Sequence, residues 1–361
     1  MTTRVYPPAQ RVRFAPILLI AAIAGAIAWI ALRPTAPAGD EITVGGNTMG
    51  GTWSVKVRRM PGRMTEDQLQ SMLQGHLDRI NAVLTTYDDA SPVCRFNRQR
   101  TEGWVSVPRD LAEVVLIAEE VSQQTGGAFD VTVAPLVNLW GFGPSRKGLR
   151  TGDIPPDAAI AAARAHVDFR KLHVRADPPA LRKDDAEIEI DLSAIGKGYA
   201  AAQLARDLDA WGAKDYLIAV GGELRARGEA RGGRPWIVGI EVPTPDTRRV
   251  LQSLPLRAAG LSTSGDYRNF VEVSGRRYSH EIDPRTGRPV AGNLASVSLV
   301  DPDSARADAM ATALFVLGPD DGYALASRSG VAAVFVARER DAFSTRATPA
   351  YQRLPTRSPI E

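Results

Sequence analysis

The sequence predicts an α+β fold in which a mixed, mainly antiparallel sheet is flanked by helices. Apolar residues recur at helical spacing in five segments, and seven other segments have the pattern of strands. Consecutive predicted strands are joined by short turns, and helices are inserted between them, which is typical of α+β proteins. The 361 residues, of which 44% are hydrophobic, suffice for one large domain or two small ones.

Five segments have the pattern of amphipathic helices. In residues 65–87 the apolar side chains share one face, and Thr65 is suited to cap the first turn. Gly126 and Gly127 end the second predicted helix, because glycine readily adopts the left-handed conformation that closes a helix. The predicted helices are residues 65–87, 108–127, 155–167, 194–213 and 304–318.

The first predicted strand precedes all the predicted helices, and the other six lie in the second half of the chain. The predicted strands are residues 52–59, 186–193, 215–228, 235–243, 269–282, 295–300 and 331–339. The fifth contains a Ser-Gly turn and therefore predicts a hairpin. The domain built from these elements is expected to span residues 44–340, followed by a polar tail over 341–361.

The N-terminus differs in kind from the rest of the chain. Residues 15–32 carry no charge, residues 1–14 contain three arginines and no acid, and residues 33–43 read as a linker. Eighteen apolar residues are just enough for a transmembrane helix, and the basic flank favours the cytoplasmic side. The sequence thus predicts a membrane anchor, with the body of the protein facing the periplasm or the cell exterior. A cleaved signal peptide is the alternative, although the bulky exit Trp29–Leu32 disfavours it.

Charge and cysteine content exclude some functions. The formal net charge is +3, and no basic stretch is interleaved with aromatic residues, so the sequence does not indicate nucleic-acid binding. Cys94 is the only cysteine and can form no internal disulfide. We interpret it as a small buried side chain rather than a nucleophile.

Two glycine-containing stretches suggest a ligand near the first half of the domain. TMGGTW (48–53) precedes a strand, where glycines allow close approach of the backbone. TGGAFDVTVAPLVNLWGFG (125–143) places Asp130 between apolar residues, where an acid needs a partner. Its aromatic residues Phe129, Trp140 and Phe142 could wall a planar ligand or belong to the core.

Two further stretches offer charge and oxygen ligands. DLSAIGKGYA (191–200) lies at a predicted strand-to-helix junction, where free backbone amides and Lys197 would favour an anion, although the spacing is not that of a Walker loop. In ADAMAT (307–312), Asp308 and Thr312 are four residues apart and share a helix face. Their oxygens suit a hard cation such as Mg²⁺.

The last two stretches are polar and adjoin strands. LSTSGDYRNF (261–270) contains a run of small polar residues that resembles the rim of a ligand site more than a core. YSHEIDPRTGRPV (278–290) places His280 before two acids and a Pro-containing turn. Either His280 does chemistry, or this stretch is only a polar hairpin.

Taken together and in this order, the stretches resemble the ApbE family of FAD:protein FMN transferases. The resemblance covers roughly residues 44–340 and implies an ApbE-like fold. The matching blocks are TMGGTW, LTTYDDASPVCRFN, TGGAFDVTVAPLVNLWGFG, DLSAIGKGYA, VGGELRARG, WIVGIEVP, STSGDYRNF, YSHEIDPRTGRPV and ADAMATALFVLG.

The resemblance implies an activity and its partners. Family members use Mg²⁺ to split the pyrophosphate of FAD, and Mn²⁺ is a possible alternative for this chain. They transfer FMN to a threonine hydroxyl and release AMP. Serine is a second possible acceptor. The acceptor proteins carry a Ser/Thr-rich flavinylation motif and are typically subunits of membrane redox complexes. Two other functions stay open: an FAD pyrophosphatase giving FMN and AMP, and a non-catalytic FAD-binding or delivery protein.

Site residues follow from the resemblance, block by block. The implied FAD-site residues are Met49, Tyr87, Ala128, Phe129, Asp130, Asp191, Lys197, His280 and Ile282. The implied metal ligands are the side chains of Asp308 and Thr312 with the carbonyls of Ala194 and Ala311.

The resemblance makes His280 the candidate general base. Asp283 would either orient this histidine or cap the turn before Pro284. Glu281 departs from the isoleucine common in the family at this place, and its side chain could point outward or touch the ligand.

Overall fold

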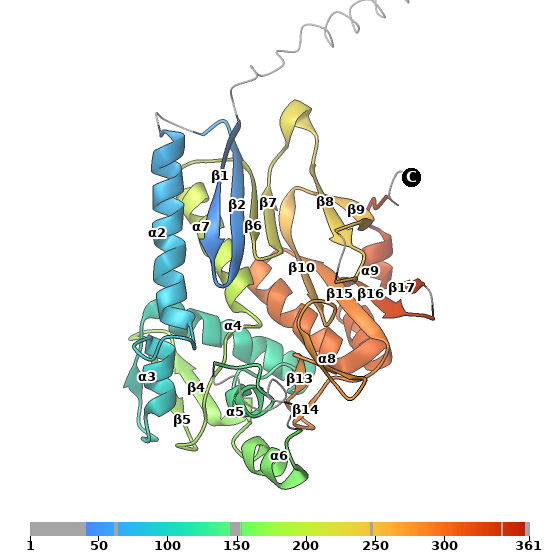
Figure 1. The fold of residues 1–361 in the computed structure, drawn as a ribbon. Coiled ribbons are helices and arrows are strands. Elements are labelled where there is room, and N and C mark those ends of the chain that lie inside the picture. Colours follow the sequence, from blue (N-terminus) through green and yellow to red (C-terminus); the bar gives the residue numbers. More distant parts are fainter. Residues whose placement is uncertain are drawn as a thin grey trace, which may run out of the picture. The chain divides into compact units, whose positions relative to one another are not determined.

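An eight-stranded antiparallel sheet, in the order β1-β2-β6-β7-β10-β15-β16-β17, organises the fold (Figure 1). Its strands are β1 Glu41–Thr48, β2 Gly51–Arg58, β6 Asp215–Val220, β7 Glu223–Arg227, β10 Ala258–Gly265, β15 Leu294–Asp301, β16 Ala332–Arg338 and β17 Phe343–Ala347. The structure is a computed structural model that describes residues 41–60, 64–144, 152, 154–245, 248–340 and 342–357. Antiparallel pairing throughout this sheet confirms the α+β prediction.

Helices cover one face of this sheet and enclose the main core. They are α2 Glu66–Leu84, α4 Arg109–Thr125, α7 Gly196–Ala210 and α8 Ser304–Arg328. α8 packs on β10 and β15, and α7 packs on α8. The ends are capped as the sequence indicates: Thr65 forms a capping box, and Gly126 ends α4 with φ 61°. The Asp303 side chain accepts the amides of Ala305 and Arg306 at the start of α8.

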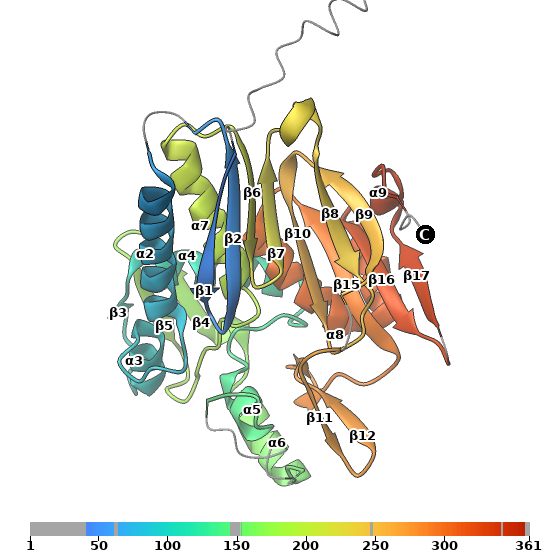
Figure 2. The same ribbon diagram turned by 45° about the horizontal axis from the view of Figure 1, so that its top comes forward.

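A smaller layer covers the opposite face. It consists of the hairpin β8 Trp236–Glu241 and β9 Val250–Leu256 and the short helix α9 Pro349–Gln352. Trp236, Leu254 and Tyr351 are buried there against Leu261 of the main sheet. Figure 2 shows this hairpin beside β10.

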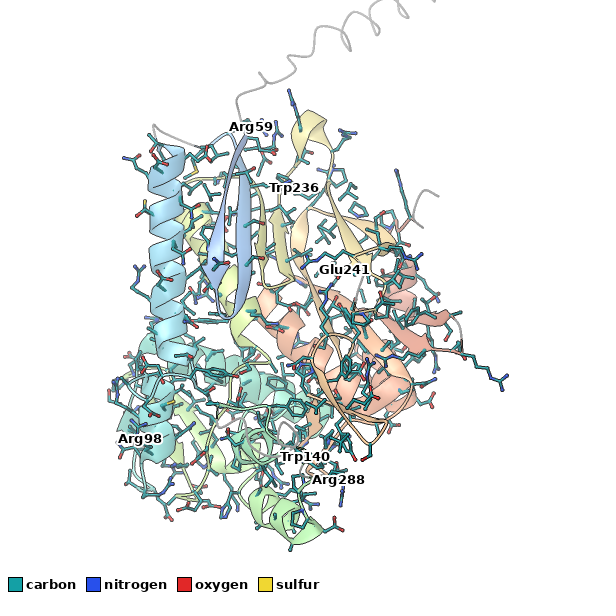
Figure 3. All side chains as sticks on the ribbon, viewed as in Figure 1. Arg59, Arg98, Trp140, Trp236, Glu241 and Arg288 are labelled. Atoms are coloured by element: carbon teal, nitrogen blue, oxygen red, sulfur yellow. The ribbon has the colours of Figure 1, made fainter. Side chains whose placement is uncertain are left out.

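Most of the remaining elements extend from one end of the main sheet, whereas the 3-10 turn at Arg231–Gly233 lies at the other end (Figure 2). The remaining elements are α3 Pro92–Arg98, α5 Ala134–Leu139, α6 Asp157–Arg164, β3 Val105–Ser106, β4 Leu172–Arg175, β5 Ala180–Lys183, β11 Phe270–Val273, β12 Arg276–Ser279, β13 Ile282–Asp283 and β14 Arg288–Pro289, with 3-10 turns at Phe169–Lys171 and Arg231–Gly233. Trp140, at the end of α5, stacks on Tyr278 and donates its Nε1–H to Gly287 O at 2.8 Å. Trp140 therefore belongs to the core that joins α5 to the β12–β14 region (Figure 3).

One predicted strand is wrong. Residues 186–193 form no ladder beyond a single bridge between Glu189 and Val133. The alternation is real, since Ile188 and Ile190 are fully buried. The side-chain amide of Asn97 pairs with both backbone groups of Ile190, at 2.8 and 2.9 Å, in place of a partner strand.

Two boundaries also differ from the predictions. Residues 215–228 make two strands, because Gly221 and Gly222 both have positive φ and reverse the chain between β6 and β7. The predicted tail from residue 341 contains β17 and α9, which extend the sheet and bury Tyr351. Its polar composition reflects an edge strand with one face in solvent.

The predicted membrane anchor at residues 15–32 lies outside the described residues. Within the part of the chain that the structure describes, no helix is long and apolar enough to span a membrane. Cys94 is buried in α3, in agreement with its predicted role as a small packed side chain.

Candidate functional site

A cavity of about 630 Å³ gathers most of the predicted site residues, although they come from segments far apart in the sequence. It lies among the β6–β7 turn, β10, the start of α7, the first half of α8 and the loops before α5 and after β12. The predicted residues that line it are Tyr87, Ala128, Phe129, Asp130, Asp191, Ala194, Lys197, His280, Ile282, Asp308 and Thr312. Phe142 also lines it, whereas Trp140 is core.

Three predicted residues lie outside the cavity lining. Met49 occupies the β1–β2 turn with φ 48°, next to the lining residues Gly51 and Thr52. Ala311 is fully buried within α8. The Asp283 carboxylate accepts the backbone N–H and the guanidinium of Arg285, so it caps the turn rather than orienting His280.

Three acidic side chains surround one lysine in this cavity. Lys197 Nζ lies 3.6 Å from Glu223 Oε1, and the charges of Asp308 and Glu281 also act on it. Burial opposes the charge on Lys197, but the carboxylates outweigh it and raise the lysine pKa. Burial also raises the pKa of all three acids, against the opposing charge of Lys197. A cation bound beside these acids would favour their ionised forms and offset the cost of burying the carboxylates.

Asp308 and Thr312 are placed by close contact between α7 and α8. Asp308 Oδ2 accepts the Gly198 amide at 2.8 Å, and the Ser304 hydroxyl donates to Gly198 O at 2.9 Å. The Thr312 hydroxyl lies 2.9 Å from that of Ser264 on β10. Both Asp308 and Thr312 line the cavity together with Ala194, as the helical spacing and the family resemblance predict.

These residues fit a hard cation by donor chemistry. Carboxylate, hydroxyl and carbonyl oxygens are the ligands that Mg²⁺ prefers, and it usually retains water and substrate oxygens as well. Within the described residues there is no group of three or more His, Cys, Asp or Glu side chains placed to hold a metal. A cation at Asp308 would therefore need the Thr312 hydroxyl, backbone carbonyls and substrate oxygens to complete its coordination.

Gly198 is the residue that permits the α7–α8 contact. A Cβ at this position would lie 2.2 Å from Ser304 O and 2.6 Å from Asp308 Cβ. We expect Gly198→Ala to lower the free energy of unfolding by about 2 kcal/mol or more, because overpacking outweighs the better helix propensity of alanine. Urea unfolding measures this loss. Gly75→Ala on α2, where the nearest atom is 3.8 Å away, is the control and should stabilise the protein slightly.

Asp130 is held by hydrogen bonds at the cavity wall. Its Oδ1 accepts both the amide and the hydroxyl of Thr132, and its Oδ2 accepts the Phe169 amide at 2.9 Å. Burial outweighs these bonds and raises the pKa of Asp130 to about 6. Asp130, for which the sequence indicated no partner, thus links the loop before α5 to the turn at Phe169–Lys171.

The raised pKa of Asp130 predicts a pH-dependent stability. Between pH 3.8 and about 6 the folded protein binds this proton more tightly than the unfolded chain does. The stabilisation is complete below this range and is lost as pH rises through it. Without FAD, the wild type should therefore lose stability relative to Asp130→Asn as pH rises from about 4 to about 7. Thermal unfolding of both proteins at each pH tests this, and a difference between them that does not change with pH would contradict it.

The sequence did not single out several residues that line the cavity. They are Gly221, Gly222, Glu223, Glu241, Arg248, Tyr267, Arg268 and Asn269. Glu241, labelled in Figure 3, projects from β8, and its carboxylate pairs with Arg268. A partial signal for Glu223 was present, because an acid that directly follows two glycines within the predicted strand 215–228 can lie where the backbone turns tightly.

Comparison with known proteins gives one consistent result. The model of the ApbE family matches residues 49–335. The FAD:protein FMN transferase of Salmonella typhimurium is 40% identical over 85% of this chain and 87% of its own length. That of Escherichia coli K12 is 37% identical over 89% of this chain and 91% of its own. The apo crystal structure of the flavinyl transferase ApbE from Pseudomonas stutzeri superposes with a TM-score of 0.79 at 38% identity, covering 88% of this chain and 98% of that one.

Proposed function

The chain belongs to the ApbE family and is a flavin transferase, and we propose that it moves the FMN moiety of FAD to a threonine or serine hydroxyl of an acceptor protein and releases AMP. The observation that carries the proposal is the cavity that brings Asp308, Thr312, Lys197 and His280 together. A protein that only binds FAD has no need for a cation-binding carboxylate beside a lysine and a histidine.

We assign a separate role in the reaction to each group of side chains in the cavity. We assign to Lys197 the binding of the FAD phosphates, because its ammonium lines the cavity in the first turn of α7 and lysine is a common phosphate ligand. Asp308 and Thr312 would hold Mg²⁺, with Mn²⁺ as a substitute, and the cation supplies charge neutralisation for the phosphoryl oxygens. Phe129 and Phe142 provide apolar wall for the flavin.

The transfer step balances with these residues. The acceptor oxygen forms a bond to the FMN phosphorus. The bond between this phosphorus and the bridging oxygen of the pyrophosphate breaks, and AMP leaves with the bridging oxygen. The acceptor hydroxyl loses its proton to His280, which lines the cavity. No other histidine of the described residues lines it. Water in place of the acceptor hydroxyl would give FMN and AMP, which is the pyrophosphatase reaction.

One assay tests the proposal against its alternatives. The full-length protein is incubated with FAD, Mg²⁺ and an acceptor carrying a Ser/Thr-rich flavinylation motif. Covalent flavin fluorescence on the acceptor, with equimolar AMP, supports transfer. AMP and FMN with no labelled acceptor would mean hydrolysis, and the absence of both products would leave only FAD binding.

We further propose that residues 15–32 anchor the catalytic domain on the periplasmic side of the inner membrane, where it meets acceptor subunits of membrane redox complexes. The uncharged run with its basic flank supports this orientation. Mass spectrometry of the mature N-terminus tests it, since a start near Ala36 would mean cleavage of a signal peptide.

A further inference from the structure

We propose that Ser264 is a positioning residue for the cation site: its oxygen accepts the proton of the Thr312 hydroxyl and so leaves the lone pairs of Thr312 for the cation. The proposal rests on the proposed function, and it adds a residue that the family resemblance does not include among the metal ligands. The two hydroxyl oxygens lie 2.9 Å apart, within hydrogen-bond distance. Ser264 and Thr312 are 7% and 8% exposed, and both line the cavity.

The packing of α8 on β10 places these two hydroxyls opposite each other. Ser304 and Thr312 are eight residues apart on α8, a rise of about 12 Å, and Gly260 and Ser264 are four residues apart on β10, a rise of about 13 Å. Both ends of this match are in contact. A Cβ on Gly260 would lie 3.1 Å from Ser304 Cα, and Ser264 forms the hydrogen bond with Thr312. The position of Ser264 is therefore set by a strand and a helix of the main core rather than by a loop.

The direction of this hydrogen bond determines whether Thr312 can bind a cation. A hydroxyl has one proton and two lone pairs. If Ser264 donated to Thr312, one lone pair of Thr312 would be occupied and its proton would be left without an acceptor. If Thr312 donates to Ser264, both lone pairs of Thr312 stay free for a cation, and the proton of Ser264 can point into the cavity that this residue lines. Ser264 is the only hydrogen-bond partner of the Thr312 side chain among the described residues, so it is the acceptor available for this proton.

The other side chain assigned to the cation has a support of its own. Asp308 Oδ2 accepts the Gly198 amide at 2.8 Å, so α7 orients this carboxylate. The two proposed ligands lie on one helix, but their orienting groups come from different elements, α7 for Asp308 and β10 for Thr312. Residues that orient metal ligands typically change metal affinity by about 10–100-fold when they are replaced. A single hydroxyl on β10 should therefore have a measurable effect on cation binding.

The first test measures cation binding without transfer. Mn²⁺ is titrated into the full-length protein with FAD and no acceptor, unbound Mn²⁺ is quantified by EPR, and FAD alone is the blank. Ser264→Ala should raise the Kd for Mn²⁺ by about 10-fold, because the proton of Thr312 loses its acceptor. Ser298→Ala is the matched control: it removes a buried hydroxyl that pairs with Thr263 at 2.7 Å between β10 and β15, and it should bind Mn²⁺ as the wild type does. An unchanged Kd in Ser264→Ala, an equal rise in both variants, or a wild type that binds no Mn²⁺ would overturn the proposal.

The second test is the Mg²⁺ dependence of transfer. Ser264→Ala should need about 10-fold more Mg²⁺ for the half-maximal rate and should approach the wild-type kcat when Mg²⁺ is saturating, since only the affinity for the cation is reduced. A loss of kcat that added Mg²⁺ does not restore would contradict the proposed role and indicate a disrupted cavity. If the wild type binds Mn²⁺ but transfers no flavin, the proposed function fails, while the Kd values still decide whether Ser264 positions Thr312.

Discussion

Asp308→Ala is expected to abolish Mg²⁺-dependent transfer, with a loss of about 10³-fold or more, equivalent to about 4 kcal/mol of transition-state stabilisation. Asp308 is 4% exposed, lies in the cavity wall and, with Thr312, is one of the two side chains assigned to the cation. AMP release is measured at increasing Mg²⁺, and Mg²⁺ binding is measured separately by calorimetry. Full activity of the wild type in EDTA would contradict the assignment of a metal.

Asp308→Asn separates the charge of this residue from its structural role. The asparagine oxygen can still accept the Gly198 amide, so the α7–α8 contact is retained. Because burial raises the pKa of Asp308, the carboxylate costs stability in the folded protein. We therefore expect the Asn variant to unfold at the same temperature as the wild type or higher, while losing activity.

A control for Asp308 lies in the part of α8 that follows the kink at Gly318. Asp320 is 90% exposed on α8 and pairs only with Arg346 at the surface. Asp320→Asn should leave transfer and stability nearly unchanged, because exposed ion pairs contribute little. Similar losses in the Asp308 and Asp320 variants would mean that α8 is merely sensitive to substitution.

Local patterns predicted the helices well because their signals lie within a few turns of chain. Thr65, Gly126 and the periodic apolar residues of α2 and α4 each act on neighbours, so their effect is readable in sequence. The prediction of a strand at residues 186–193 was wrong because the hydrogen-bond partner of this segment is distant in sequence. Their alternation records burial of Ile188 and Ile190, but the hydrogen-bond partner is a side chain from a distant helix. No local pattern could identify Asn97 as that partner.

The site residues also differ in whether local sequence could predict them. Asp308 and Thr312 were readable because four residues on a helix fix their mutual placement. The family resemblance supplied Lys197 and His280, which local spacing alone could not connect. The roles of Glu223 and Glu281 needed the structure, because both are buried where their charges act on Lys197. Asp283, which the sequence offered as a partner of His280, instead accepts hydrogen bonds from Arg285 within the turn that follows it.

His280→Ala is expected to lower the rate of flavin transfer by about 10²–10⁴-fold, the usual contribution of a general base. FAD binding should remain, since the phosphate-binding and apolar parts of the cavity are untouched. Transfer is followed by covalent flavin fluorescence on the acceptor, and binding by titration of FAD. The distinction between the two measurements is essential, because loss of both would point to a disrupted cavity instead of a missing base.

Another histidine supplies the control for His280. His76, His166 and His173 each pair with an aspartate and do not line the cavity. His173, a third exposed beside Asp184, is the most suitable to replace. His173→Ala should transfer flavin at the wild-type rate, because a surface pair of this kind adds little stability and no chemistry. Wild-type transfer by His280→Ala would remove this residue from the mechanism and leave water or the acceptor itself to take the proton.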